Sequence, residues 1–331
     1  MIKLRYRLKN DKNRVLIHRK ELDLKSYYLK RLVSLLITIV LITTLTFAMM
    51  HSIPGGPFTR ERPVPEAILK ALNEKYNLDD PILVQYFKYM KGLVTFDLGP
   101  SYSKIGTTVN ELIIEGFPAT AKIGGLAILL IVILGIPLGV ISALKQNKGI
   151  DYFVMFIATL GITVPNFVIA TGIIYFFAGQ LGWIPSFGLS TPASYIGPVI
   201  ALAGYSLSFI ARLTRSSMLE VLRQDYIRTA RANGIGEFTV IAKHAIKNAL
   251  IPVVTYLGPT IAAILTGSFV IEKIFAIPGI GRYFVESVTN RDYTTIMGIT
   301  VFYALFYLIM ILLVDITYSF LDPRIKLKGD K

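Results

Sequence analysis

The sequence predicts an all-α integral membrane protein with six transmembrane helices. Of its 331 residues, 53% are hydrophobic and only 17% are charged, which is too apolar for an ordinary soluble protein of this length. A hydrocarbon core about 30 Å thick requires roughly 20 apolar residues in a helix. Six stretches reach or approach that length: 32–53, 123–143, 152–178, 195–211, 249–271 and 296–314.

Basic residues are distributed unevenly along the chain, which sets the expected orientation. Eleven Lys and Arg residues lie in residues 1–31, before the first span, whereas the loop 179–194 contains none. Because positive charge in short loops resists translocation, the basic N-terminal segment 1–31 and the tail 320–331 are both expected to be cytoplasmic, in a multi-pass protein of the cell membrane. Orientation and contact with anionic membrane lipid account for the formal net charge of +14, so no nucleic-acid partner is indicated.

A small, mostly helical outer domain is expected between the first two spans. The first transmembrane helix, 32–53, is followed by the sequence IPGGPF, whose prolines and glycines end a helix. Within the extracytoplasmic segment 54–118, residues 65–92 repeat apolar side chains at three- and four-residue spacing. The other spans form a five-helix core over 119–319, with a cytoplasmic loop at 212–248.

Polar side chains inside the apolar spans are few, and each costs free energy unless it faces protein or water. Asn166 follows Pro165 in the third span, and Tyr205, Ser206 and Ser208 cluster in the fourth. Two interpretations stay open. These residues line a translocation path, or they form hydrogen bonds between helices.

Two further features of the spans concern packing and charge. Gly135 and Gly139 form a G-x-x-x-G pair that permits close contact between helices. Asp315 lies at the inner end of the sixth span near Lys and Arg residues, which favours an interfacial ion pair over a proton relay.

The cytoplasmic loop predicts an amphipathic helical hairpin. A first helix over 218–233 ends at Gly234, because glycine adopts the left-handed conformation without a Cβ clash. A second helix starts near Glu237 and places an apolar set on one side: Phe238, Ile241, Ala245 and Ala249. The hairpin either lies on the inner leaflet or inserts into a partner protein. Small residues at its turn favour a partner, since close approach to a protein groove requires them: Ala230, Ala232, Gly234 and Gly236.

No sequence motif for catalysis is present. The chain lacks a G-x-x-x-x-G-K-[ST] phosphate loop, an H-E-x-x-H metal helix and a G-x-S-x-G nucleophile elbow. It also has no cysteine, which excludes disulfides and thiolate metal sites. We therefore expect a chain that is not an enzyme and holds no cofactor or metal of its own.

The run ARANGIGEFTVIAKHAIKNALIPVV resembles the EAA loop of ABC-importer permeases, with a glycine four residues after Ala230 and an Ile-Pro near the next span. The loop reads Ala-Arg-Ala where that family has Glu-Ala-Ala. The resemblance is to the dipeptide, oligopeptide and nickel branch and covers nearly the whole chain after residue 26. Further matching pieces are TFAMMHSIPGGPF, YNLDDPILVQYFKYMKGLVTFDLGPSY, SFVIEKIFAIPGIGRYF, RDYTTIMG and LVDITYSFLDPR.

This resemblance implies a type I ABC-importer permease, one of two homologous membrane subunits that import peptides by alternating access. Two cytoplasmic ATPase subunits, which hold ATP and magnesium, would bind the loop, and an extracytoplasmic solute-binding protein would deliver the cargo. ATPase coupling is accordingly expected of Arg228, Ala230, Arg231, Ala232, Gly234, Gly236 and Glu237. An outer gate or a docking site for the binding protein is expected at Glu272, Pro278, Gly279, Gly281 and Asp292.

Two alternatives to peptide import stay open. Nickel or another small solute is an alternative cargo within the same family. A stand-alone secondary transporter is an alternative of a different class, although such carriers usually place carboxylates or broken helices at mid-membrane.

Overall fold

The computed structural model of the chain describes residues 30–54, 56–58 and 66–321, and within these residues it is helical with no strand. The expectations for most of segment 1–31, for most of the tail 320–331 and for the Asp315 side chain lie outside what is described. Five helices are long and apolar enough to cross a membrane, and a sixth span is possible if one bent pair counts as one. The five are Lys30–His51, Val109–Leu144, Pro192–Leu222, Glu237–Leu265 and Tyr293–Val314.

Each spanning unit is assembled from shorter helical elements. The first half of the described chain contains α2 (Glu66–Tyr76), α3 (Ile82–Val94), α4 (Val109–Leu130), a π-helical turn (Ile131–Gly135), α5 (Ile136–Leu144), α6 (Gly149–Thr163) and α7 (Asn166–Ile173) with its π-helical end (Ile174–Gln180). The second half contains a 3-10 turn (Pro192–Tyr195), α8 (Ile196–Leu222), α9 (Asp225–Ala232), α10 (Glu237–Thr239), a π-helical segment (Val240–Ala245), α11 (Ile246–Leu265), α12 (Phe269–Ile274), α13 (Ile280–Thr289) and α14 (Tyr293–Leu321).

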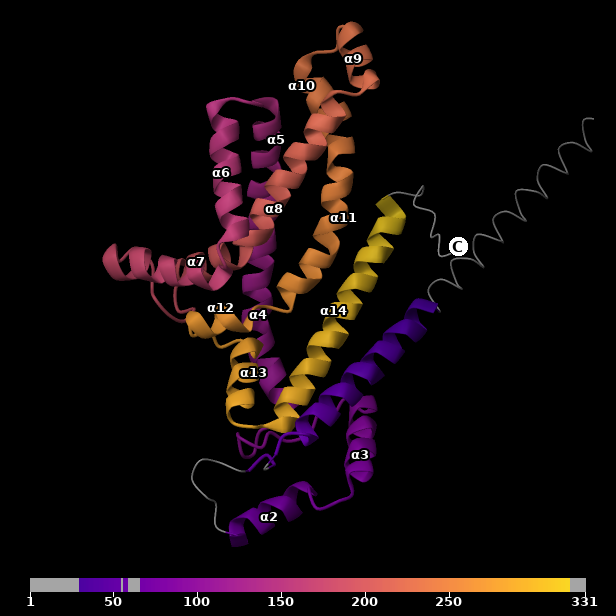
Figure 1. Cartoon of the computed structure of the whole chain (residues 1–331), viewed down its shortest axis with the longest axis vertical. Coiled ribbons are helices and arrows are strands. Elements are labelled where there is room, and N and C mark those ends of the chain that lie inside the picture. Colours follow the sequence, from indigo (N-terminus) through magenta and orange to yellow (C-terminus); the bar gives the residue numbers. More distant parts are fainter. Residues whose placement is uncertain (1–29, 55, 59–65, 322–331) are drawn as a thin grey trace, which may run out of the picture.

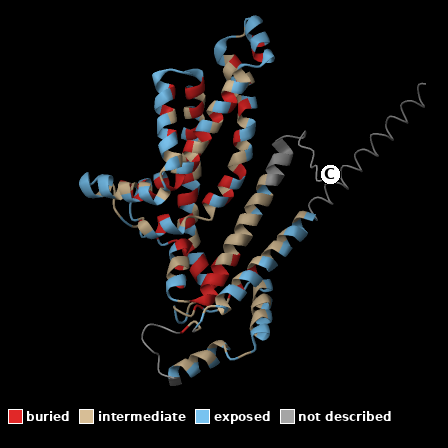
Figure 2. Ribbon diagram, viewed as in Figure 1, coloured by how far each residue is buried: buried red, intermediate tan, exposed pale blue. Residues whose placement is uncertain are grey.

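Helix α8 is the centre of the bundle (Figure 1), and it packs against α4, α5, α6, α7 and α11. The α9–α10 hairpin lies at one end of the molecule, and α2 and α3 lie at the opposite end. The hairpin and the α2–α3 region are thus separated by the length of the bundle. Buried residues gather where α8 meets its neighbours, and again where α4 meets α13 and the start of α14 (Figure 2).

The third predicted span, 152–178, is not one straight helix. Helices α6 and α7 meet at a bend of 107°. The bend falls at Val164 and Pro165, where Val164 is extended with φ −83° and ψ 124°. Proline clashes with a helical residue before it and cannot donate a backbone hydrogen bond, so the helix ends there. The sequence pattern predicts an unbroken span through Pro165 and does not predict this bend.

The second span begins earlier than the sequence indicated. Thr108 caps α4 by accepting a hydrogen bond from the Glu111 backbone, while the Glu111 side chain bonds back to Thr108. This capping box starts the helix at Val109, so residues 109–118 of the expected outer segment 54–118 form its first turns. The described remainder of that segment contains α2 and α3.

Glycines allow α8 to approach its neighbours closely. A Cβ added at Gly139 in α5 would lie 2.5 Å from the Ala211 carbonyl oxygen of α8, and one at Gly135 would lie 3.2 Å from the Leu207 carbonyl oxygen. The G-x-x-x-G pair noted in the sequence is thus a helix contact. Gly124 in α4 makes the same kind of approach to α11, where a Cβ would lie 2.9 Å from the Ile264 carbonyl oxygen.

An ion pair between α6 and α8 adds a polar contact to this packing. Arg215 donates two hydrogen bonds to the Asp151 carboxylate, from Nε to Oδ1 at 2.6 Å and from Nη2 to Oδ2 at 2.7 Å. Asp151 also accepts from the Ser142 hydroxyl and, at 2.9 Å, from the Asn147 backbone N–H. The carboxylate is 2% exposed, so these donors replace the water that it loses on burial.

The glycine contact at α8 gives a direct stability test. We expect Gly139→Ala to lower the free energy of unfolding by about 1–3 kcal/mol, because its Cβ overlaps backbone atoms that cannot move independently. Gly125→Ala, in the same spanning helix, is the matched control, since a Cβ there meets nothing within 4 Å. Thermal unfolding in detergent measures both variants. Equal melting temperatures for the two would contradict the close contact.

Candidate functional site

The α9–α10 hairpin is a compact unit with a glycine turn. Gly234 has φ +76°, a left-handed conformation that favours glycine, whereas Gly236 at φ −59° has an ordinary backbone. The Ile235 N–H donates to the Ala230 carbonyl at 3.3 Å and ends α9. Across the turn, Arg231 makes a two-pronged ion pair with Glu237, with N–O distances of 2.6 and 3.0 Å. This exposed pair orients the turn but stabilises it by at most about 1 kcal/mol.

The inner side of the hairpin packs on the bundle. Ile227 and Ala230 are buried together with Met218 of α8 and Ala249 of α11, in a cluster that also includes Ala143, Val240 and Ala245. Ala230 is therefore part of the hairpin's own core and presents little surface to a partner. A hydrogen bond of 2.9 Å from Asn248 to the Tyr226 hydroxyl further joins α9 to α11.

The outer side of the hairpin exposes the remaining small and charged residues. Of the predicted coupling set, Arg228, Arg231, Ala232, Gly234, Gly236 and Glu237 are all exposed. Phe238 is 85% exposed, although the sequence pattern placed it on the apolar side with Ala245 and Ala249. The π-helical segment after Thr239 changes the helical register, and Phe238 consequently faces away from the core. An exposed aromatic side chain beside a small-residue turn is typical of a protein contact.

The four polar residues that the sequence predicts inside the spans differ in their exposure. Ser206 and Ser208 are 9% and 4% exposed, so for them helix packing is the better interpretation, whereas Tyr205 is 42% exposed. Asn166 is half-buried at the first position of α7, directly after the bend. Tyr205 begins an aromatic ladder in which Phe209 stacks on Tyr256 of α11 with ring centroids 4.2 Å apart.

One stripe of α8 residues is left largely uncovered by neighbouring helices, and the residue types differ between its two halves. Ile196 and Ile200 form the outer half, and the inner half carries Tyr205, Phe209, Arg212 and Ser216. Surfaces of the bundle that suit lipid are aliphatic or aromatic without charge, such as the exposed side of α6 with Ile150, Phe153, Phe156 and Ile157. A polar stripe on the central helix is instead suited to a water-accessible passage. We call these four inner residues the passage stripe.

The outer end of the bundle contains a buried carboxyl group. Glu272 of α12 accepts hydrogen bonds from the Gly281 N–H at 2.8 Å and from the Thr120 hydroxyl at 3.1 Å, and Thr120 accepts from the Ile280 N–H. Gly267, with φ +81°, and Gly279 and Gly281 leave no room for a Cβ beside it. We call this arrangement the Glu272 cradle. It fixes α12 and α13 against α4.

Asp292 is likewise a structural anchor. It is fully buried before α14 and accepts a capping hydrogen bond from the Thr295 N–H at 3.1 Å. It also accepts from the Ser101 hydroxyl at 2.5 Å and from the Ser103 N–H at 3.0 Å. These bonds connect the loop between α3 and α4 to the start of α14. Of the five residues expected at an outer gate or docking surface, only Pro278 is exposed, while Glu272, Gly279, Gly281 and Asp292 are internal.

The two buried carboxyls differ in their preferred charge. Burial raises the pKa of Glu272 from 4.5 to about 7, although the Gly281 and Thr120 donors act in the opposite direction. Burial also favours the neutral form of Asp292, but hydrogen bonds from Ser101 and Ser103 keep its pKa below the ordinary value. Within the described residues, no group of three His, Asp or Glu side chains is placed to hold a metal ion.

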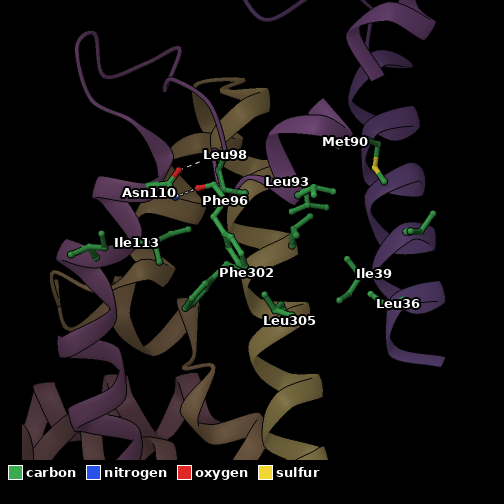
Figure 3. Close-up of a pocket in the computed structure, with 14 residues that line it drawn as sticks. Leu36, Ile39, Met90, Leu93, Phe96, Leu98, Asn110, Ile113, Phe302 and Leu305 are labelled. Atoms are coloured by element: carbon green, nitrogen blue, oxygen red, sulfur yellow. Dashed lines mark hydrogen bonds between the residues drawn. The ribbon is translucent and has the colours of Figure 1, made fainter. Parts of the chain in front are cut away.

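One apolar hollow in the described part of the chain is not suited to a polar cargo. It measures about 440 Å³ and lies between helix Lys30–His51, α3, α4 and α14 (Figure 3). Its one polar lining residue, Asn110, donates to the Phe96 carbonyl at 2.7 Å and accepts from the Leu98 N–H at 2.9 Å. The lining therefore offers only apolar contacts.

A bundle of apolar spans with a helical hairpin at one end and a small helical region at the other is the architecture of a membrane-spanning transport subunit. The chain belongs to the family of binding-protein-dependent transport system inner membrane components, which it matches over residues 135–327. Residues 24–124 match the N-terminal region described for such membrane components.

Curated relatives and solved structures agree with this membership. The chain is 53% identical to the dipeptide transport system permease protein DppB of Bacillus subtilis over 301 residues, covering 91% of this chain and 98% of that protein. It is 43% identical to the oligopeptide transport system permease protein OppB of Salmonella typhimurium, covering 91% and 99%. A solved structure of the MetNI methionine ABC transporter in an inward-facing conformation shares the fold, with a TM-score of 0.53 and 17% identity over 64% of this chain and 96% of that one.

The Glu272 cradle makes stability depend on pH. The folded state retains a proton on Glu272 that the unfolded chain loses near pH 4.5, so the contribution of Glu272 to stability is complete below pH 4.5 and is lost as the pH rises through about 7. We expect Glu272→Gln to reduce this fall in melting temperature between pH 5 and 8. Glu286→Gln, at a more exposed carboxylate paired with Arg282, is the control and should keep the wild-type dependence. An unchanged pH profile for Glu272→Gln would contradict the buried neutral carboxyl.

Proposed function

We propose that this chain is one of two homologous transmembrane subunits of an ATP-driven importer of dipeptides or oligopeptides. The observation that carries this proposal is its similarity, over nine-tenths of its length, to permeases named for dipeptide and oligopeptide transport. The proposed complex contains a second permease, two cytoplasmic ATPase subunits that bind ATP and magnesium, and an extracytoplasmic solute-binding protein. In the proposed complex, the hairpin and both termini lie on the cytoplasmic side of the membrane.

The hairpin supports a coupling role because it is joined to the helices that border the passage. Its buried residues Ile227 and Ala230 pack on Met218 of α8 and Ala249 of α11. Those two helices also carry Tyr205, Phe209 and Tyr256. A displacement at the hairpin tip would thus move the aromatic ladder together with its helices, which is what alternating access driven by the ATPases requires.

The outer end supports a gate that moves as a unit. The Glu272 cradle fixes α12 and α13 to α4 through Thr120, and Asp292 fixes the outer loop to α14. In our proposal the binding protein contacts the exposed surface around Pro278 and the outer helices α2 and α3. The buried carboxyls hold that surface in shape and do not themselves touch the binding protein.

Reconstitution in liposomes tests the proposed function. The chain, its second permease, both ATPases and the binding protein should accumulate peptide only when ATP is supplied on the ATPase side. Uptake of solute by this chain alone, driven by an ion gradient, would favour the secondary transporter. Specific uptake of nickel with no uptake of peptide would assign the alternative cargo.

Phe238 provides the sharpest test of coupling. We expect Phe238→Ala to leave expression intact and to lower binding-protein-stimulated ATPase activity at least about tenfold, since an exposed aromatic anchor can contribute 2 kcal/mol or more to an interface. Phe156→Ala, at a 61% exposed phenylalanine on α6, is the control and should retain activity. Full stimulation in the Phe238 variant would show that the hairpin tip is not the contact.

Gly234 separates backbone strain from docking. A Cβ at Gly234 meets nothing within 4 Å, so Gly234→Ala adds only the left-handed strain of about 1 kcal/mol. Gly234→Trp adds a bulky group at the presumed contact, and we expect it to abolish uptake while Gly234→Ala retains a measurable rate. Equal uptake by the two variants would contradict a packed groove around the turn.

A further inference from the structure

The inner end of the passage stripe borders a cavity with one uncompensated positive charge. The cavity measures about 460 Å³ and is lined by residues of α6 and α8, including Arg212, Arg215 and Asp151. Asp151 is already paired with Arg215 through two hydrogen bonds. In the described part of the chain, no carboxylate lies within ion-pair distance of Arg212. The charged groups that line the cavity therefore have a net charge of +1.

The cavity also offers two hydroxyl groups. Tyr152 and Ser216 line the same cavity, and among the described residues their hydroxyls make no hydrogen bond. Arginine presents a planar fork of N–H donors that matches a carboxylate, and hydroxyls can donate to the same anion. The lining is thus chemically suited to one small anionic group.

Its position indicates a cargo site more than a lipid site. Arg212 lies on the same face of α8 as Tyr205, Phe209 and Ser216, at three- and four-residue spacing on the central helix. An ionisable residue in a spanning helix is costly in lipid and is found facing a bundle interior or a water-filled cavity. An anionic lipid would place its acyl chains on the exposed side of α6 next to Tyr152, whereas a peptide would lie along the aromatic residues of the α8 stripe.

We propose that Arg212 binds the C-terminal carboxylate of a peptide in transit, with Tyr152 and Ser216 as further donors. This inference rests on the proposed function as a peptide importer. A permease that accepts many peptides cannot depend on their side chains, whereas every unmodified peptide ends in a carboxylate. An arginine in the passage therefore recognises the cargo class without restricting its sequence.

The distance along α8 fits a short peptide. Arg212 lies seven positions after Tyr205, which corresponds to about 10 Å at the helical rise per residue. Three extended residues span roughly the same length. With its carboxylate at Arg212, a dipeptide or tripeptide would place its side chains beside the Tyr205, Phe209 and Tyr256 rings, which accept apolar and cationic groups alike.

The test compares peptides with free and amidated C-termini in the reconstituted complex. We expect Arg212→Gln to lower uptake of the free peptide about tenfold relative to the unmodified chain, in line with loss of a charge-assisted hydrogen bond. Uptake of the amidated peptide should change less than about twofold, because its C-terminus carries no negative charge for Arg212 to bind. For each peptide, uptake by the variant is divided by uptake by the unmodified chain, so that any preference of the binding protein for one peptide cancels.

Matched variants make the outcome specific. Arg212→Lys keeps the charge and should give an intermediate loss, and Lys148→Gln removes a nearby exposed charge outside the cavity and should leave both peptides unaffected. Elution of each variant complex as one assembled peak in size-exclusion chromatography, with the yield of the unmodified complex, checks that all three variants fold and assemble.

Other outcomes overturn the inference in distinct ways. Failure of the unmodified complex to transport any peptide would overturn the proposed function as well. Normal peptide uptake by Arg212→Gln, with the unmodified complex active, would overturn the carboxylate site alone. An equal loss for both peptides would also overturn it, and a simultaneous loss of phosphatidylglycerol from the purified complex in native mass spectrometry would assign the cavity to a lipid headgroup.

Discussion

Close packing of α8 against its neighbours is the constraint on which the rest of the structure depends. The α8 and α5 backbones meet where Gly135 and Gly139 have no side chain, and Gly161 of α6 provides the same clearance beside Ser208. Without a strong hydrophobic force between helices in lipid, such contacts supply much of the association energy. With most of its circumference covered, α8 has one open stripe, and the half of it nearer the hairpin has polar and aromatic residues.

The same helix connects both functional regions. Toward the hairpin, Met218 enters the apolar cluster that holds Ile227 and Ala230, so the hairpin is an extension of α8 and α11 more than a separate domain. Toward the middle, Phe209 stacks on Tyr256 and couples those two helices a second time. In the proposed function, a movement imposed at the hairpin would reach the passage stripe through these packed contacts.

Local patterns in the sequence predicted the elements well, and long-range contacts less so. The apolar stretches, the Gly135 and Gly139 pair and the Gly234 turn follow from composition, spacing and backbone preference, and each is present. The α6–α7 bend was predictable from Pro165, and the passage stripe from the spacing of Tyr205, Phe209, Arg212 and Ser216. No local signal relates Thr120 to Glu272, which lie 152 positions apart, or reveals that Ala230 is buried, because both depend on how distant helices pack.

The central claim is that the inner half of the α8 stripe faces water while the outer side of α6 faces lipid. The chain contains no cysteine, so single cysteines can be introduced without background at Tyr205, Ser216 and Phe156. The decisive measurement is their rate of reaction with a charged thiol reagent applied from the cytoplasmic side of membranes that contain the nucleotide-free complex. The account predicts fast labelling at positions 205 and 216 and slow labelling at position 156. Slow labelling at all three positions, in the presence and absence of nucleotide, would contradict it.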